Sequence, residues 1–137
     1  MALTHLVDTS VLTRLHARPV RDVIEPLTAS VGAARIGITD LEIGFSARDA
    51  AEWDGLHAAL GVFELIELRQ AHLVRARQVQ RTLADRRLRG RKVPDLLIAA
   101  AAELENLVVL HYDTDFDVIG DVTGQPTQWV VPRGSID

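Results

Sequence analysis

Several acidic residues lie where predicted buried elements begin or end, and their types and spacing suggest metal-dependent chemistry. They are Asp8, Glu42, Asp95, Asp113 and Asp115. Asp8 and Asp113 come at the ends of apolar runs, and Asp115 lies two residues after Asp113. Glu42 comes early in a helical segment, and Asp95 opens an alanine-rich helix. Polar residues at the carboxyl ends of parallel strands meet at one edge of an open sheet. Carboxylates gathered there repel one another unless cations neutralise them, and these oxygen ligands favour Mg²⁺ or Mn²⁺.

Each acid also has a purely structural explanation. Asp95 follows a proline and could be an ordinary N-terminal acid of a helix, which the helix dipole favours. Glu42 fits the third position of a capping box in which Thr39 is the N-cap. Asp113 fits a turn, whereas Asp8 ends an apolar strand and is predicted to cap no helix. The joint placement of the acids, more than any single one, therefore supports the metal site.

The elements that would position these acids alternate between strand and helix. Strands are predicted at residues 5–7, 36–39, 62–68, 107–111 and 128–131, and helices at 11–17, 20–30, 40–45, 47–60, 71–89 and 95–105. The last of these helices is apolar on every side, which is typical of a buried helix. Alternation of this kind predicts a three-layer α/β/α fold with a mostly parallel sheet of four to five strands. We expect one domain over residues 1–137.

Charge is distributed unevenly along the chain, although the formal net charge is only −4. Residues 69–92 hold nine basic residues and one acid, so the rest of the chain is strongly acidic. Such a segment can be a solvated helix face, or it can bind phosphate groups, for which the guanidinium fork of arginine is well suited. The candidates for phosphate contact are Arg75, Arg77, Arg81, Arg86, Arg87, Arg89, Arg91 and Lys92.

Composition excludes several classes of protein. The chain has no cysteine, which rules out disulfide frameworks, thiolate zinc sites and cysteine nucleophiles. No stretch approaches the roughly 18 apolar residues of a membrane span, and the N-terminal residues lack the pattern of a secretory signal. A cytoplasmic protein without membrane partners is the expectation.

Four segments together resemble the acidic signatures of the PIN-domain ribonucleases, and more narrowly those of VapC toxins from type II toxin–antitoxin modules. These segments are LVDTSVL at 6–12, TDLEIG at 39–44, PDLLIAAAA at 94–102 and VLHYDTDFD at 109–117. They follow the family's order and spacing over nearly the whole chain. A PIN-like fold and metal-dependent cleavage of RNA are what this resemblance implies.

The resemblance also implies roles for individual residues. The acidic quartet of the family corresponds to Asp8, Glu42, Asp95 and Asp113, and Asp115 corresponds to a further acid beside the metals. We expect Asp8, Asp95 and Asp113 to be the principal ligands of Mg²⁺ or Mn²⁺, with Asp115 binding directly or through water. Glu42 would contact a second ion or orient the attacking water.

Supporting roles and partners follow from the same resemblance. Thr9 or Ser10 corresponds to the hydroxyl that supports the first aspartate, and the basic segment would hold RNA phosphates flanking the cut. His111 is interpreted as a packing residue at a strand end and not as a ligand. The expected partners are RNA, a second copy of the chain in a homodimer, and a VapB-type antitoxin that forms a hetero-oligomer with the toxin.

Other families fit these residues less well. A phosphoaspartate enzyme of the haloacid-dehalogenase type needs an acid two residues after the first aspartate, where this chain has Ser10. A receiver domain needs a lysine after a late strand, whereas Lys92 precedes a helix. A catalytically inactive PIN-like module that acts only by protein or RNA binding remains the alternative, and the intact acid set disfavours it.

Overall fold

A five-stranded, fully parallel sheet forms the centre of the molecule in the computed structural model, which describes all residues except Met1 and Arg89. The strands are β1 (His5–Val7), β2 (Ala33–Ile36), β3 (Glu64–Ile66), β4 (Val108–His111) and β5 (Thr127–Trp129). Their order is β3-β2-β1-β4-β5, so β1 lies in the middle. In the register, Leu6 pairs with Ala34 on one side and with Val109 on the other. The predicted α/β fold with a parallel sheet is confirmed.

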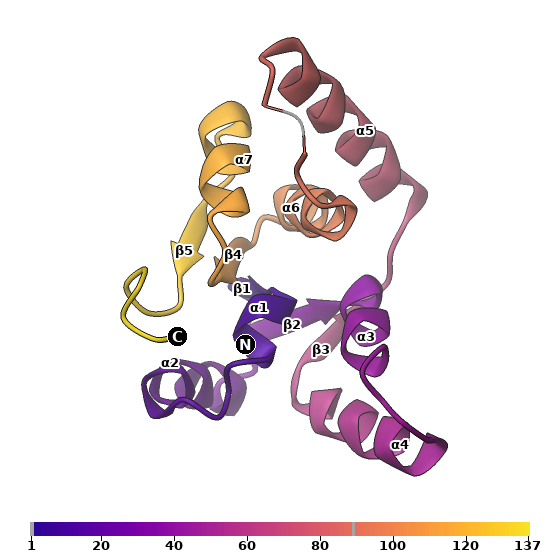
Figure 1. The fold of residues 1–137 in the computed structure, drawn as a ribbon, viewed down its shortest axis with the longest axis vertical. Coiled ribbons are helices and arrows are strands. Elements are labelled where there is room, and N and C mark those ends of the chain that lie inside the picture. The colour runs from indigo at the N-terminus through magenta and orange to yellow at the C-terminus, as the bar shows by residue number, and fades with distance from the viewer. Residues whose placement is uncertain (1, 89) are drawn as a thin grey trace.

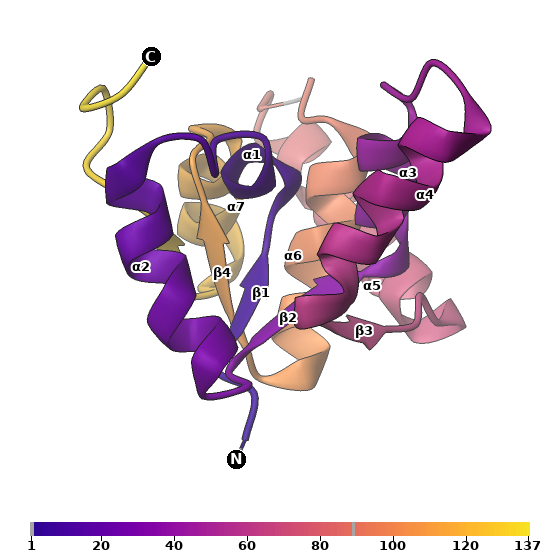
Figure 2. The same cartoon turned by 90° about the horizontal axis from the view of Figure 1, so that it is seen from below.

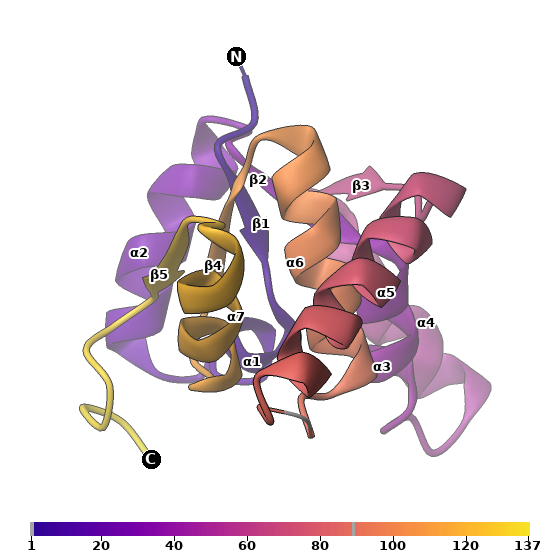
Figure 3. The same cartoon turned by 90° about the horizontal axis from the view of Figure 1, so that it is seen from above.

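Helices cover both faces of this sheet (Figures 1 and 2). They are α1 (Thr9–Leu12), α2 (Arg18–Ala29), α3 (Gly37–Gly44), α4 (Ala50–Ala59), a 3₁₀ turn η1 (Leu60–Val62), α5 (Gln70–Asp85), α6 (Val93–Glu105) and α7 (Asp115–Thr123). Helices α5, α6 and α7 pack on one face, and α1 and α2 pack on the other. Figure 3 shows α5, α6 and α7 in front of the sheet. The result is the expected α/β/α sandwich.

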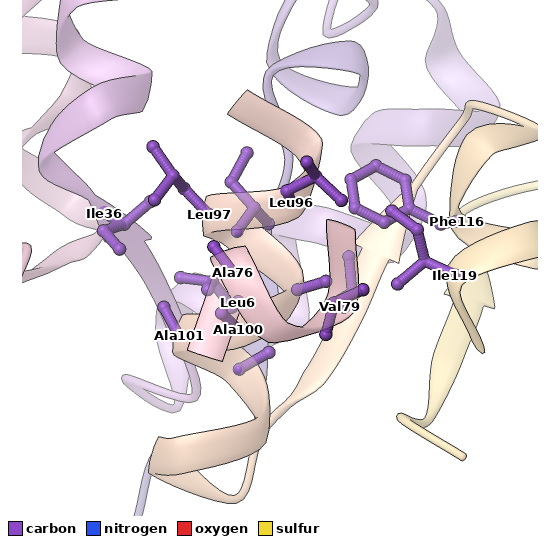
Figure 4. Close-up of a cluster of buried hydrophobic side chains, with 14 of the residues drawn as sticks. Leu6, Ile36, Ala76, Val79, Leu96, Leu97, Ala100, Ala101, Phe116 and Ile119 are labelled. Atoms are coloured by element: carbon purple, nitrogen blue, oxygen red, sulfur yellow. The ribbon is translucent and has the colours of Figure 1, made fainter. Parts of the chain in front are cut away.

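Helix α6 lies at the centre of the larger hydrophobic core. Its residues from Leu96 to Ala102 are all buried, which confirms the prediction from its apolar sequence. Ala100 and Ala101 lie close to Leu6 of β1 and Ala76 of α5, and their small side chains let these elements approach (Figure 4). This packing fixes the N-terminus of α6, which carries Asp95, against the sheet.

Several predicted boundaries are wrong. The helix predicted at 11–17 is the single turn α1 at Thr9–Leu12, which Asp8 caps, and the strand predicted at 128–131 ends at Trp129. Strand β2 ends at Ile36, and Ile38 and Thr39 lie in α3, whose Asp40 accepts a 2.7 Å hydrogen bond from Arg35 Nε. Strand β3 covers only Glu64–Ile66 of the predicted 62–68. Helix α5 ends before Gly90, since Arg87 adopts a positive φ of 61° and Leu88 N–H donates to Leu83 C=O at 2.8 Å.

Among residues 2–88 and 90–137, no helix is both long and apolar enough to cross a membrane. The candidate Arg89 of the basic segment lies outside the described residues.

Candidate active site

Asp8 is placed by the end of the central strand and by the short helix that follows it. The residue is the N-cap of α1, and its Oδ2 accepts hydrogen bonds from the backbone N–H and the hydroxyl of Ser10. The prediction that Asp8 caps no helix is therefore wrong, because the chain turns into α1 immediately after β1. Only 3% of Asp8 is exposed, and burial raises its pKa despite the two hydrogen bonds from Ser10.

Ser10 connects the ends of two neighbouring strands. Its hydroxyl donates to Asp8 and accepts a 2.9 Å hydrogen bond from the backbone N–H of Tyr112, which follows β4. The serine therefore holds the Asp8 carboxylate at a fixed position relative to the chain that leads to Asp113. This contact agrees with the supporting role predicted for this hydroxyl.

Glu42 faces the same region from α3. Its Oε1 accepts a 2.7 Å hydrogen bond from the hydroxyl of Thr9. Partial burial, and to a smaller extent the charge of Asp8, raise the pKa of Glu42, although the hydrogen bond from Thr9 acts to lower it. The predicted capping box does not form, because the N-cap of α3 is Ile36 and Thr39 is inside the helix. Glu42 is thus held by a residue of α1 and not by its own helix terminus.

Asp95 lies in the first turn of α6 and is 4% exposed. Its Oδ2 is buried and has no hydrogen-bond partner among the described residues. Burial and the nearby charge of Asp8 raise the pKa of Asp95 to about 8. A carboxylate in this setting is costly unless a cation or a proton neutralises it.

Asp113 and Asp115 complete the cluster from the segment between β4 and α7. One oxygen atom from each of Asp95, Asp113 and Asp115 lies within 4.8 Å of the others. Lys92 Nζ is 2.6 Å from Asp113 Oδ2, 3.8 Å from Asp95 Oδ2 and 4.0 Å from Asp115 Oδ2. Burial alone would raise the pKa of Asp113, but the Lys92 hydrogen bond and the Asp115 N–H lower it on balance.

A cavity of about 250 Å³ brings most of these groups together. Its lining includes all four acids of the predicted quartet, Asp8, Glu42, Asp95 and Asp113. Lys92 also lines this cavity. Asp115 lies behind them, where its Oδ1 accepts a 2.9 Å hydrogen bond from Arg91. Larger cavities exist elsewhere in the described part of the chain, but their linings hold fewer acids.

His111 supports Asp113 from the core side. The imidazole is fully buried between Phe116 and Trp129, with ring centroids 5.0 Å from each. Its Nδ1 accepts a 3.1 Å hydrogen bond from the Asp113 backbone N–H, and burial lowers its pKa to about 4. The histidine is a packing residue, as its position at the strand end predicts, and it also fixes the backbone that carries Asp113.

The basic segment divides into two groups. Arg75 pairs with Glu103 of α6, and both Arg91 and Lys92 pair with acids of the site. The exposed arginines of α5 and the turn after it are Arg77, Arg81, Arg86 and Arg87. The sequence analysis did not predict that Arg91 and Lys92 contact the acids of the site. Lys92 lies three residues before Asp95 at the beginning of a helix, and this spacing could have indicated their contact.

The residues present fit a divalent cation. All donors at the cluster are carboxylate oxygens, which hard cations prefer. Asp95 Oδ2 is buried without a hydrogen-bond donor, and burial together with neighbouring carboxylate charge raises the pKa of Asp8, Glu42 and Asp95, so a bound cation would stabilise their charged forms. A hard divalent cation such as Mg²⁺ or Mn²⁺ would supply positive charge with the matching ligand type.

Comparisons with known proteins agree with this geometry. The PIN domain family model matches residues 5–122. The chain is 58% identical to Ribonuclease VapC51 of Mycobacterium tuberculosis over 137 residues, with 100% of each chain covered. It is 40% identical to Ribonuclease VapC21 of the same species, covering 98% of this chain and 99% of the relative.

Solved structures share the fold at lower identity. VapBC2 from Rickettsia felis, bound to a DNA fragment from its promoter, has a TM-score of 0.77 at 18% identity, over 94% of this chain and 99% of that one. DNA-bound VapBC from Salmonella typhimurium has a TM-score of 0.76 at 17% identity, over 94% and 99%. Given the matched family model and the two close relatives, the chain belongs to the PIN-domain family and, within it, to the VapC-type ribonucleases.

Proposed function

We propose that this chain is a magnesium-dependent endoribonuclease, with Mn²⁺ as an alternative ion, and that it is the toxin of a type II toxin–antitoxin module. A cognate VapB-type antitoxin would inhibit it, and residues 1–137 would act as one PIN domain in the cytoplasm. The names of the relatives support the ribonuclease activity, and the VapBC complexes among the similar structures support the antitoxin partner.

The observation that carries this proposal is the buried carboxylate of Asp95. Its Oδ2 accepts no hydrogen bond from the described residues, the ammonium of Lys92 is 3.8 Å away, and the cavity that it lines holds further acids. A folded protein rarely leaves a buried charged group unpaired unless the group binds something. An acid set of this kind at the carboxyl edge of a parallel sheet is suited to phosphodiester hydrolysis.

The side chains would divide the work as follows. Asp8, Asp95 and Asp113 would hold the ion, and Asp115 would contact it directly or through water. When bound, the ion supplies charge stabilisation for the phosphate and activates water. Glu42, oriented by Thr9, would position the attacking water or contact a second ion.

The exposed arginines of the basic segment would hold phosphates on either side of the cut. Arg77, Arg81, Arg86 and Arg87 are exposed and free to contact RNA, and Arg89 belongs to the same proposal. Arg75 is already paired with Glu103, so it would contribute less. Arg91 and Lys92 would act through the acids that they contact.

An apolar groove supports the antitoxin partner. It has a volume of about 370 Å³ and is lined mainly by side chains of α1, α3, α4 and η1, including Leu12, Ile43, Leu56 and Phe63. Glu42 also lines this groove, so a peptide lying in it would reach the acid cavity. Inhibition by a segment of antitoxin is consistent with this connection.

The direct test is RNA cleavage by the Asp95→Asn variant. We expect cleavage in Mg²⁺ to fall by more than about 100-fold, because the variant removes a ligand charge without changing side-chain size. Asp121→Asn, at an exposed site of α7, is the matched control and should cleave like the unmodified protein. Circular dichroism should show that both variants are folded.

Two results would contradict the proposal. Asp95→Asn cleaving at the unmodified rate would remove Asp95 from the metal site. An unmodified protein that shows no Mg²⁺-dependent, EDTA-sensitive cleavage of any RNA tested would favour the catalytically inactive module.

A further inference from the structure

A second cavity lies directly beside the acid cavity and shares three of its lining residues. It measures about 400 Å³, and the shared residues are Arg14, Tyr112 and Asp113. Trp129, Arg133 and Asp137 line the rest of it, with Thr114 and Gly134. The two cavities are therefore neighbours, and a chain bound in the acid cavity would have its next nucleotide close to this one.

Aromatic side chains on its wall are held rigidly. The Trp129 indole donates from Nε1 to Asp117 at 3.1 Å and packs edge-on against Tyr112, with centroids 5.3 Å apart. The Tyr112 hydroxyl donates to Ile136 C=O at 2.6 Å, and the Arg14 guanidinium lies 4.9 Å from the centre of its ring. These contacts and the neighbouring His111 ring hold the half-buried Trp129 in one orientation in the cavity wall, so ordering this side chain costs little on binding.

Two arginines, Arg14 and Arg133, line the same cavity together with two aspartates, Asp113 and Asp137. Arg133 is exposed and its side chain makes no ion pair or hydrogen bond with the described residues, and Arg14 pairs with Asp137 at 3.2 Å. The Asp137 side chain is 55% exposed, so this pair is weak and a phosphate can replace the carboxylate. Aromatic rings combined with arginines are the features by which proteins hold unpaired nucleotides.

We infer that this cavity binds one unpaired nucleotide of the RNA next to the cut, with its base on Trp129 and its phosphates at Arg14 and Arg133. The inference rests on the proposed ribonuclease function and adds to it a place for the flanking nucleotide. Asp137 competes with the RNA phosphate for Arg14, so the Asp137 carboxylate weakens RNA binding at this subsite.

The two tryptophans of the sequence allow a direct measurement. In a protein carrying Asp95→Asn to prevent cleavage, Trp53→Phe leaves Trp129 as the only indole, and Trp129→Phe leaves only Trp53. Trp53 lies on α4, beyond the opposite edge of the sheet from β5, and serves as the matched control (Figure 1). Titration with oligouridylate in Mg²⁺ should quench the fluorescence of Trp129 and leave that of Trp53 unchanged.

Charge variants test the phosphate contacts in the same titration. Arg133→Ala should weaken RNA binding about two- to fivefold and lower the slope of log affinity against log salt by about 0.7. Arg48→Ala, which removes an equal charge before α4, should change neither quantity. Asp137→Asn should tighten binding about two- to fivefold, because it frees Arg14.

Equal quenching of both tryptophans, or no quenching of either, would overturn the subsite. So would an Arg133→Ala protein that binds RNA like Arg48→Ala. RNA cleavage by the unmodified protein is measured separately. Cleavage without quenching of Trp129 fluorescence would contradict the subsite and support the proposed function. Quenching of Trp129 fluorescence by RNA without any cleavage by the unmodified protein would support the subsite and contradict the proposed function.

Discussion

Lys92 is the only lysine of the sequence, and its ammonium group lies among the acids of the site. It is 2.6 Å from Asp113 Oδ2 and within 4.0 Å of oxygens on Asp95 and Asp115. An ammonium there offsets part of the repulsion between the carboxylates when no divalent ion is bound. The same position implies that Lys92 must share these acids with an arriving ion or move away from them.

Replacing Lys92 tests this counter-ion role. In EDTA, Lys92→Met should lower the free energy of unfolding by about 1 kcal/mol, because the remaining carboxylates repel one another. Addition of Mg²⁺ should then raise the melting temperature more in this variant than in the unmodified protein. Lys92→Arg keeps the charge and is the control. Equal stability of all three proteins in EDTA would contradict the role.

Among the elements, α5 shows how a basic helix can be attached to the core through a few polar contacts. His72 is fully buried, and its Nδ1 accepts a 3.1 Å hydrogen bond from the Arg69 backbone N–H at the start of the helix. Arg69 and Arg75 pair with Glu105 and Glu103 of α6. These contacts fix the orientation of α5 and leave its other arginines exposed to solvent.

The buried histidine makes stability depend on pH. Burial, followed by the charge of Arg69, lowers the pKa of His72 below 6.5, so the unfolded chain binds a proton that the folded chain does not. Stability from the neutral imidazole is present above pH 6.5 and is lost as the pH falls below it. Between pH 7.5 and 5.5 we therefore expect this residue to lower the free energy of unfolding.

Urea denaturation of the unmodified protein and of His72→Gln at both pH values measures this contribution. Glutamine stays neutral and can still accept a hydrogen bond, so the variant should lose less stability on acidification. The buried His111 is retained in both proteins, and its effect cancels in the comparison. An identical loss in both proteins would show that His72 contributes nothing to the pH dependence.

For the molecule as a whole, the two most exposed large apolar side chains of the described residues lie on or next to α3. Phe45 is 92% exposed and Leu41 68%, and Trp53 and Val62 are exposed on or just after the neighbouring α4. Apolar surface on these two helices can become buried when two copies of the chain associate. It supports the proposed homodimer, with the antitoxin groove on adjoining elements.

Light scattering after size-exclusion chromatography tests this assembly. The unmodified chain should elute with twice its mass of 15.1 kDa, and Phe45→Glu should elute as a monomer, since a buried carboxylate would be left unpaired in the interface. Leu104→Glu, at an exposed position of α6, should keep the dimer. A monomeric unmodified protein, or a Phe45→Glu dimer of unchanged affinity, would contradict the proposed interface.

The sequence predicted the layers of the fold and the set of acids, because both follow from patterns along the chain. The all-apolar run after Asp95 indicated a buried helix, and the acids followed recognisable strands. Local detail could not be predicted in the same way. The cap at Asp8 depends on a turn that begins directly after β1, and the helical state of Thr39 depends on where the chain turns after Ile36. The Lys92 contact with Asp113 joins residues that are 21 positions apart, and no local pattern predicts it.

The order of the strands also has a consequence for synthesis of the protein. Asp8 follows the first strand and Asp113 the fourth, and these strands pair side by side. At about 5 to 20 residues per second, a ribosome needs roughly 5 to 20 s to progress from one aspartate to the other. During that time the nascent chain has no complete set of acids, so the translation machinery that makes this protein is not exposed to its activity until most of the chain has emerged.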